Sequence, residues 1–350
     1  GQARSAVAGL IGAKASEVVF TSSATEANHL AILGTLRARP DRRHVVTTAV
    51  EHPSNLMLFE DLRSQGYHVT VLPVDASGLI RRHELASVVS SDTALVSVMW
   101  ANNETGVLMP VAEAADIARS RGAAFHTDAV QAVGRLEVDL REMKIDLLTF
   151  SGHKLHGPKG VGVLFVRKGF ALAPVIMGHQ ERHLRGGTEN VPAIVGLGVA
   201  ARLAVEALAA RSGAAVAALR DRLETALVEA IPNCFVTGNP ANRLPNTANI
   251  AFEFIEGEAI LLLLNEEGIA ASSGSACTSG SLEPSHVMRA MGVPYTAAHG
   301  ATRFSLSRDT TAEEIDTVIR VMPGIIERLR KLSPYWTGQG AAAGFQPVYS

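Results

Sequence analysis

Short apolar runs alternate with helix-like stretches through the first half of the chain. The segment 94–100 (ALVSVMW) is almost entirely apolar, which is typical of a strand that is buried on both faces. Strands that alternate with helices build mostly parallel sheets with right-handed crossovers. We therefore expect an α/β fold with a mostly parallel central sheet. The alternation predicts strands at 17–21, 44–49, 67–74, 94–100, 124–128, 146–151 and 162–166, and helices at 25–37, 54–65 and 111–121.

The pattern changes in the second half, where a long Ala-rich helix is expected at 193–208. We interpret the residues beyond this helix as a smaller α/β domain. The division predicts a large domain over 1–205, a small C-terminal domain over 206–337 and a loosely packed, Gly/Ala-rich tail over 338–350. In the small domain we expect helices at 214–231, 257–267 and 312–332, and strands near Phe235 and at 247–253.

Composition narrows the class of protein. The 350 residues are 47% hydrophobic and 19% charged, which is enough for a sizeable core. The net charge of −2 gives no sign of a nucleic-acid or membrane partner. Two cysteines, Cys234 and Cys277, do not make a disulfide framework, so we expect a cytoplasmic protein.

Neither the apolar segments nor the start of the chain indicates a targeting signal. The most apolar segment, 191–201, is soon followed by Arg202 and Glu206, so no membrane span is expected. The first residues, 1–4, look like the middle of a helix rather than a signal peptide, and we expect an N-terminal segment to be missing.

Polar clusters follow the predicted strands, at the edge where open α/β sheets bind ligands. The phrase 151–154 (SGHK) places a hydroxyl, an imidazole and an amine together at a strand end. A lone lysine there is usually a solvated charge. Next to a hydroxyl and an imidazole, Lys154 is instead typical of a lysine that forms a Schiff base beside a phosphate-binding site.

Four further features extend this site, and all of them except Gln131 also have a structural explanation. Asp128 ends a strand and can be a helix cap, or the carboxylate that keeps a pyridinium nitrogen protonated. Gln131, one helical turn later, can reach a ring hydroxyl. The hydroxyl-rich segment 22–26 is an ordinary N-cap or an anion site at a helix start. His52 is structural, or it stacks on a cofactor ring and moves protons.

The segment 272–281 (SSGSACTSGS) consists of small residues around one thiol. A structural cysteine sits among apolar neighbours, whereas Cys277 lies on a polar loop, as suits a thiol that reaches a substrate. Cys234 leads into a strand and is interpreted as structural. Arg303, in a predicted strand, is a surface charge or a bidentate partner for a substrate carboxylate.

Together these residues resemble the class-V aminotransferase family, and within it the cysteine desulfurases of the NifS type rather than the IscS type. The resemblance covers nearly the whole chain. It rests on SSATEAN at 22–28, EHPSN at 51–55, VMWANNETG at 98–106, HTDAVQAVG at 126–134, SGHKLHGPKGVG at 151–162, RGGTEN at 185–190, SSGSACTSGSLEPSHVMRAMG at 272–292 and TRFSLSRDTT at 302–311.

The resemblance implies a homodimer of the pyridoxal-phosphate (PLP) transferase fold type I. It makes Lys154 the Schiff-base lysine and His52 the stacking imidazole. Asp128 and Gln131 match the groups on the ring nitrogen and ring hydroxyl, and Thr188 matches a phosphate ligand given to the partner subunit. The full set of implied cofactor contacts is Ala24, Thr25, His52, Asn103, Asp128, Gln131, Ser151, His153, Lys154 and Thr188.

The implied reaction takes sulfur from L-cysteine, leaving L-alanine and a persulfide on Cys277. Asn103 and Arg303 match the contacts to the substrate carboxylate, and Cys277, Lys154 and His52 are the implied catalytic residues. The sulfur is expected to reach an iron–sulfur scaffold protein, for cluster assembly in nitrogenase maturation. No intrinsic metal is expected, although Cys277 could briefly ligate a cluster shared with the scaffold. Selenocysteine lyase, another class-V transaminase and a non-catalytic partner-binding protein remain the alternatives.

Two departures from the family pattern stand out. A segment near a D-N-N-A-T-T phrase, which helps to wall the active site, is absent. The run 176–180 (IMGHQ) has one glycine where the family has two. We therefore expect the turn before Glu181 to be shifted by a residue, in the loop that carries Thr188.

Overall fold

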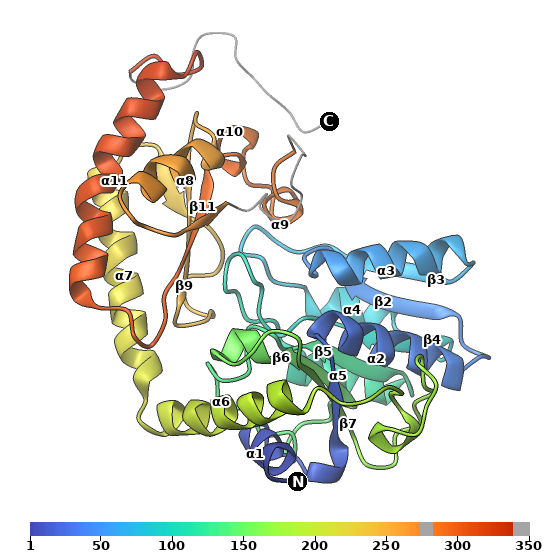
Figure 1. Ribbon diagram of the computed structural model, residues 1–350. Coiled ribbons are helices and arrows are strands. Elements are labelled where there is room, and N and C mark those ends of the chain that lie inside the picture. The colour runs from blue at the N-terminus through green and yellow to red at the C-terminus, as the bar shows by residue number, and fades with distance from the viewer. Residues whose placement is uncertain (274–282, 339–350) are drawn as a thin grey trace. The chain divides into compact units, whose positions relative to one another are not determined.

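The computed structural model describes residues 1–273 and 283–338 (Figure 1). The chain forms two compact units. Unit 1 comprises residues 1–73, 80–102 and 108–210. Unit 2 begins at Arg211 and also takes in the short segments 74–79 and 103–107, which no sequence pattern predicted.

Unit 1 is built on a seven-stranded sheet with the order β1-β7-β6-β5-β4-β2-β3. The run from β3 to β6 is parallel, and β7 is antiparallel to both β6 and β1. The expected α/β fold with a mostly parallel sheet is therefore confirmed. The strands are β1 (Val18–Thr21), β2 (His44–Thr48), β3 (His68–Leu72), β4 (Thr93–Ser97), β5 (Ala124–Asp128), β6 (Leu147–Ser151) and β7 (Gly162–Val166).

The central strands are buried along their whole length, as the apolar runs predicted, and helices cover the sheet. The helix α2 turns Ala27, Leu30 and Ala31 toward the strands and packs on β6 and β7. The helices of unit 1 are α1 (Gln2–Leu10), α2 (Ala24–Ala38), α3 (Pro53–Ser64), α4 (Arg82–Val88), α5 (Val111–Ser120) and α6 (Val191–Ala209), with 3₁₀ turns η1 (Ala15–Glu17), η2 (Gly152–Leu155) and η3 (Glu181–His183).

The helix α6 lies against α1 (Figure 1). Their backbones approach so closely that a Cβ atom on Gly198 would lie 2.7 Å from the Cβ atom of Ala3. On another face, α6 exposes Val191, Val195 and Val199, which recur every four residues and so form one apolar stripe. By length and composition alone α6 could cross a membrane, a test that core helices of soluble proteins also pass.

Unit 2 contains an antiparallel sheet of four strands with the order β10-β11-β9-β8. Its core packs the sheet against α7, α8 and α11 around side chains such as Leu227, Phe252 and Met322. Thr311 and Glu314 form a capping box that starts α11. The elements are α7 (Ser212–Ala230), β8 (Cys234–Val236), β9 (Thr247–Phe252), α8 (Gly257–Glu266), β10 (Ser272–Ser273), α9 (His286–Ala290), α10 (Tyr295–Ala298), β11 (Ala301–Ser305) and α11 (Ala312–Leu332).

Cys234 packs against this core at the start of β8. Its thiol donates to the backbone oxygen of Ile231 at 3.1 Å. Burial raises the pKa of Cys234 to about 11, so the thiolate is scarce at neutral pH. The environment of Cys234 is that of a structural cysteine.

Candidate functional site

The polar residues that follow β2, β5 and β6 lie at one edge of the sheet. The strands are parallel, so their carboxyl ends meet at this edge. Asp128 ends β5, His52 follows β2, and Lys154 lies in η2 directly after β6. The charges of Asp128 and Lys154 both act on His52, so both groups lie within electrostatic reach of the imidazole.

Asp128 is a buried carboxylate with defined hydrogen bonds. Its Oδ1 atom accepts from the backbone N–H of Val130 at 3.0 Å, and its Oδ2 atom accepts from Nδ2 of Asn28 at 2.8 Å. Burial raises the pKa of Asp128, while both hydrogen bonds and the nearby His52 oppose this effect. Asp128 ends β5 at this edge, where a buried carboxylate can serve a cationic group.

Sequence reasoning did not identify Asn28 as part of this site. Asn28 is 1% exposed and lies on the face of α2 that packs on the sheet, next to Ala27 and Leu30. A polar side chain on an otherwise apolar helix face was the available signal, because a buried amide needs partners.

His52 has a second task as the N-cap of α3. Its Nδ1 atom accepts from the backbone N–H of Ser54 at 3.2 Å. Since a backbone N–H can only donate, the neutral imidazole carries its proton on Nε2. Burial lowers the pKa of His52, the carboxylate of Asp128 opposes this, and the amine of Lys154 adds to it. The ring is therefore a neutral donor through Nε2.

Lys154 is exposed on η2, which continues directly from β6. In the same turn, Oγ of Ser151 and Nδ1 of His153 are 2.7 Å apart. His156 ends η2 in the left-handed conformation with φ of 60°. The amine, the hydroxyl and the imidazole of the SGHK phrase thus project from one short turn at the carboxyl edge.

Gln131 lies in a turn. The three-residue spacing from Asp128 had predicted a helix at this position. The backbone N–H of Val133 closes this turn onto the oxygen of Ala129 at 3.0 Å. Gln131 is half-buried, and Arg135 bridges it to the lysine segment by donating to the backbone oxygens of Gln131 and Lys154 at 3.0 and 3.3 Å.

The segment 22–26 begins α2 with an ordinary N-cap, one of the two interpretations that the sequence left open. Oγ of Ser23 accepts from the backbone N–H of Glu26 at 3.2 Å. Ala24 is buried and Thr25 is exposed in the first turn. The dipole of α2 still favours an anion at this end.

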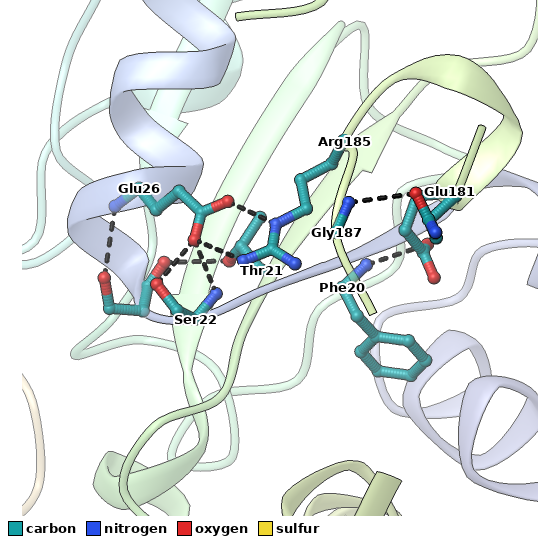
Figure 2. A network of polar contacts seen from close by, with 9 residues as sticks. Phe20, Thr21, Ser22, Glu26, Glu181, Arg185 and Gly187 are labelled. Carbon is teal, nitrogen blue, oxygen red and sulfur yellow. Dashed lines mark hydrogen bonds and ion pairs between the residues drawn. The ribbon is translucent and has the colours of Figure 1, made fainter. Parts of the chain in front are cut away.

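An ion pair joins this helix start to the RGGTEN loop (Figure 2). Arg185 binds Glu26 with both arms of its guanidinium, Nε to Oε1 at 2.6 Å and Nη2 to Oε2 at 3.1 Å. Burial raises the pKa of Glu26, but Arg185 and Ser22 outweigh it and lower the value. The ion pair thereby anchors the loop that carries the exposed Thr188 to the first turn of α2.

A second carboxylate fixes the preceding turn (Figure 2). Glu181 is buried and accepts from the backbone N–H of Phe20 at 3.0 Å. It also binds Arg4 at 2.6 Å. It stands in left-handed backbone, as do Arg182 and His183. The single glycine of the run before it, Gly178, packs on the RGGTEN loop, where its Cβ would lie 2.5 Å from Cα of Gly186.

Asn103 and Arg303 belong to unit 2, and the structure brings them together. Nη1 of Arg303 donates to the backbone oxygen of Asn103 at 2.7 Å. The buried Nε atom of Arg303 has no hydrogen-bond partner among residues 1–273 and 283–338. Cys277, the expected sulfur acceptor, lies outside the described residues.

Two buried glutamates beside these positions were not anticipated. Oε1 of Glu51 accepts from the backbone N–H of Met99 and from the hydroxyl of Thr48, both at 2.8 Å. Burial raises the pKa of Glu51 to about 8. In unit 2, Glu104 accepts from the hydroxyl of Ser285 at 2.6 Å, and burial raises its pKa to about 7. Glu51 precedes His52 and Glu104 follows Asn103 in the sequence. This proximity to expected site residues was the only sequence signal for the two glutamates.

The chain is similar to known proteins over most of its length. The class-V aminotransferase family matches residues 1–318. The chain is 57% identical to the cysteine desulfurase NifS of Azotobacter vinelandii, over 99% of this chain and 88% of that protein. A solved NifS-like protein has a TM-score of 0.87 at 36% identity, covering 94% of this chain and 87% of that chain. SspA, solved in complex with cysteine, has a TM-score of 0.75 at 34% identity, covering 89% and 87%. The chain therefore belongs to the class-V aminotransferase family, in the branch of the NifS-type cysteine desulfurases.

Proposed function

We propose that this protein is a PLP-dependent cysteine desulfurase, which transfers the sulfur of L-cysteine to Cys277 and releases L-alanine. The observation that carries the proposal is the meeting of Lys154, His52 and Asp128 at one edge of the parallel sheet. An amine, a flat imidazole and a buried carboxylate are the groups that a pyridine aldehyde cofactor requires.

The residues present fit that cofactor. Lys154 would hold it covalently, Asp128 would face its ring nitrogen, and Gln131 its ring hydroxyl. The buried setting of Asp128, with two hydrogen bonds directed at its carboxylate, suits a partner for one protonated nitrogen. Bound PLP would supply an electron sink conjugated to the α-carbon of the substrate.

The phosphate would lie at the start of α2. The N–H groups and positive dipole end of α2 provide an anion site there. Thr25, Ser151 and His153 would add side-chain donors. Thr188 would serve the phosphate of a partner subunit, from a loop held by the pair of Arg185 and Glu26. The apolar stripe of Val191, Val195 and Val199 on α6 is consistent with a homodimer, because a stripe of this kind is seldom left exposed.

The chain's own groups divide the remaining tasks. Arg303 and Asn103 would hold the carboxylate of L-cysteine and so fix which bond of the α-carbon reacts. Lys154, once exchanged for the substrate amine, would remove the α-proton as a general base. His52, with its proton on Nε2, is suited to donate that proton to the product or to guide the thiol proton of the substrate.

Sulfur transfer balances without any outside oxidant. The thiolate of Cys277 would attack the substrate sulfur, so that an S–S bond forms while the bond between Cβ and sulfur breaks. The electron pair left at carbon takes a proton, and alanine results. Cys277 keeps the sulfur at the oxidation level of a persulfide, while the substrate carbon is reduced. A thiol acceptor, which we propose to be a cytoplasmic iron–sulfur scaffold protein of nitrogenase maturation, would then take the sulfur.

Alanine release from L-cysteine, with PLP and a reductant, tests this function. The wild-type chain, Cys277→Ala and the matched control Cys234→Ala are compared. We expect alanine from the wild type and from Cys234→Ala, and none from Cys277→Ala. Alanine release by Cys277→Ala would show that another group accepts the sulfur. A wild-type chain that binds PLP but stays silent would contradict the desulfurase activity itself.

A further inference from the structure

A continuous series of buried polar side chains leads from the middle of the sheet to Asp128. It crosses β4, β5 and β6 and ends on α2. Each of its members is at most 1% exposed, so water does not compete for their hydrogen bonds. We call this series the donor chain; its members are Ser97, His126, Thr149 and Asn28.

The direction of the hydrogen bonds follows from the end at Asp128. A carboxylate can only accept, so Nδ2 of Asn28 donates to Oδ2 of Asp128 at 2.8 Å. The amide oxygen of Asn28 then points away and can only accept. The hydroxyl of Thr149 lies in close contact with that oxygen and must therefore donate to it.

The same reasoning shows which ring nitrogen of His126 carries the proton. Burial lowers the pKa of His126 to about 3, so its ring is neutral and carries one proton. The single hydroxyl proton of Thr149 is already given to Asn28, so Nε2 of His126, 3.5 Å from Oγ1 of Thr149, must be the donor. Nδ1 of His126 is then an acceptor for the hydroxyl of Ser97 at 2.8 Å.

All donors thus point toward Asp128, and such an aligned series polarises each bond in turn. We propose that the donor chain is a positioning device, which holds the carboxylate of Asp128 ionised and oriented for the ring nitrogen of PLP. The inference rests on the proposed function. It assigns no contact with the cofactor to the four residues themselves: they act through Asp128.

Other charges also act on Asp128. His52 at the start of α3 lowers its pKa, and Glu51, at the end of the turn before α3, interacts with it. Neither contact orients the carboxylate as the hydrogen bond from Asn28 does. Thr149 is the decisive member, because its hydroxyl donates to the amide oxygen of Asn28 and so supports the hydrogen bond from Asn28 to Asp128.

The test removes the hydroxyl of Thr149 and keeps its shape, with Thr149→Val, and restores the hydroxyl with Thr149→Ser. The matched control is Thr47→Val on β2. Thr47 is equally buried in the same sheet, and its hydroxyl has no hydrogen-bond partner within the part of the chain that the structure describes. Urea unfolding of the four apo proteins verifies that each variant is folded.

Two readouts on the bound cofactor, neither of them turnover, report on Asp128. PLP labelled with ¹⁵N at the ring nitrogen gives a chemical shift that depends on protonation of that nitrogen. Titration of apo protein with PLP gives the Kd. We expect Thr149→Val to move the ¹⁵N shift toward the unprotonated value and to weaken PLP binding by about tenfold, the size of one weakened hydrogen bond to a charged group. Thr149→Ser and Thr47→Val should match the wild type.

The outcomes separate the two proposals. A Thr149→Val protein with the ¹⁵N shift and Kd of the wild type overturns the donor chain alone. So does a Thr47→Val protein that changes as much as Thr149→Val, because the effect would then be one of packing. A folded wild-type chain that does not bind PLP overturns the proposed function, and the donor chain with it.

Discussion

Arg303 points one arm of its guanidinium at the backbone oxygen of Asn103, 2.7 Å away, although 200 residues separate the two in sequence. The contact uses Nη1 and leaves other N–H groups of the fork for a ligand. It also holds the segment 103–107 to β11 within unit 2. We expect Arg303 and Asn103 to bind the same substrate carboxylate. The contact between them therefore orients Arg303 before the substrate binds.

Arg303→Lys should separate substrate binding from cofactor binding. Lysine keeps the charge but loses the planar fork, so we expect KM for L-cysteine to rise about 10-fold or more, with the Kd for PLP unchanged. Steady-state kinetics and PLP titration measure the two quantities. Arg328→Lys, an exposed position on α11, is the control. A normal KM in Arg303→Lys would exclude a bidentate contact to the carboxylate.

Two substitutions of His52 can separate its role as the N-cap of α3 from its role in catalysis. His52→Asn retains a side-chain acceptor at the N-cap of α3, whereas His52→Ala does not. We expect His52→Ala to lower the free energy of unfolding by about 1 kcal/mol and His52→Asn to leave it nearly unchanged. Both should lower kcat by about 10²-fold, the usual share of a general acid–base group. If His52→Asn retains full kcat, the imidazole has only a structural task.

Glu51 should make the stability of the protein depend on pH. Its pKa is about 8 when folded and 4.5 as an ordinary glutamate, so the folded chain binds the proton more tightly. The contribution of Glu51 to the free energy of unfolding is complete below about pH 4.5 and is lost as the pH rises through about 8. Urea unfolding at pH 5, 7 and 8.5 should show a smaller loss of stability for Glu51→Gln than for the wild type. Glu60→Gln, an exposed position on α3, should follow the wild type.

Gly186→Ala should damage the RGGTEN loop. A Cβ atom there would lie 2.1 Å from the backbone oxygen of Met177, a distance that neither backbone can accept without moving. We expect a loss of about 1–3 kcal/mol in the free energy of unfolding. Gly9→Ala, in α1 where nothing lies within 4 Å of the added atom, should be neutral or stabilising. Equal effects of the two substitutions would mean that the close approach of 177 and 186 does not exist in solution.

The sequence predicted those features that depend on chain order alone. Apolar runs placed the strands, and the strand ends placed Asp128 and Lys154 at one edge, because parallel strands end on the same side. The predicted start of α2 was one residue late, at Thr25 instead of Ala24. Such a shift is small because the cap residue Ser23 was already visible as a polar residue before an apolar run.

Features that depend on packing between distant segments were not predicted. Asn28 meets Asp128 across a separation of 100 residues, and a local pattern can place Asn28 on the buried face of α2 without naming its partner. The segments 74–79 and 103–107 join unit 2 without any change in composition. Gln131 was placed on a helix because three-residue spacing cannot distinguish a helix from a single turn.

The hydrogen-bonded, half-buried state of Cys234 also makes the protein convenient for chemical labelling. With a pKa of about 11, roughly one Cys234 in ten thousand carries a thiolate at pH 7, and alkylating reagents attack the thiolate. The sequence contains one other cysteine, Cys277. Brief treatment of the native protein with a thiol reagent at neutral pH should therefore report on Cys277 without mutating Cys234, and the rate of labelling gives its reactivity directly.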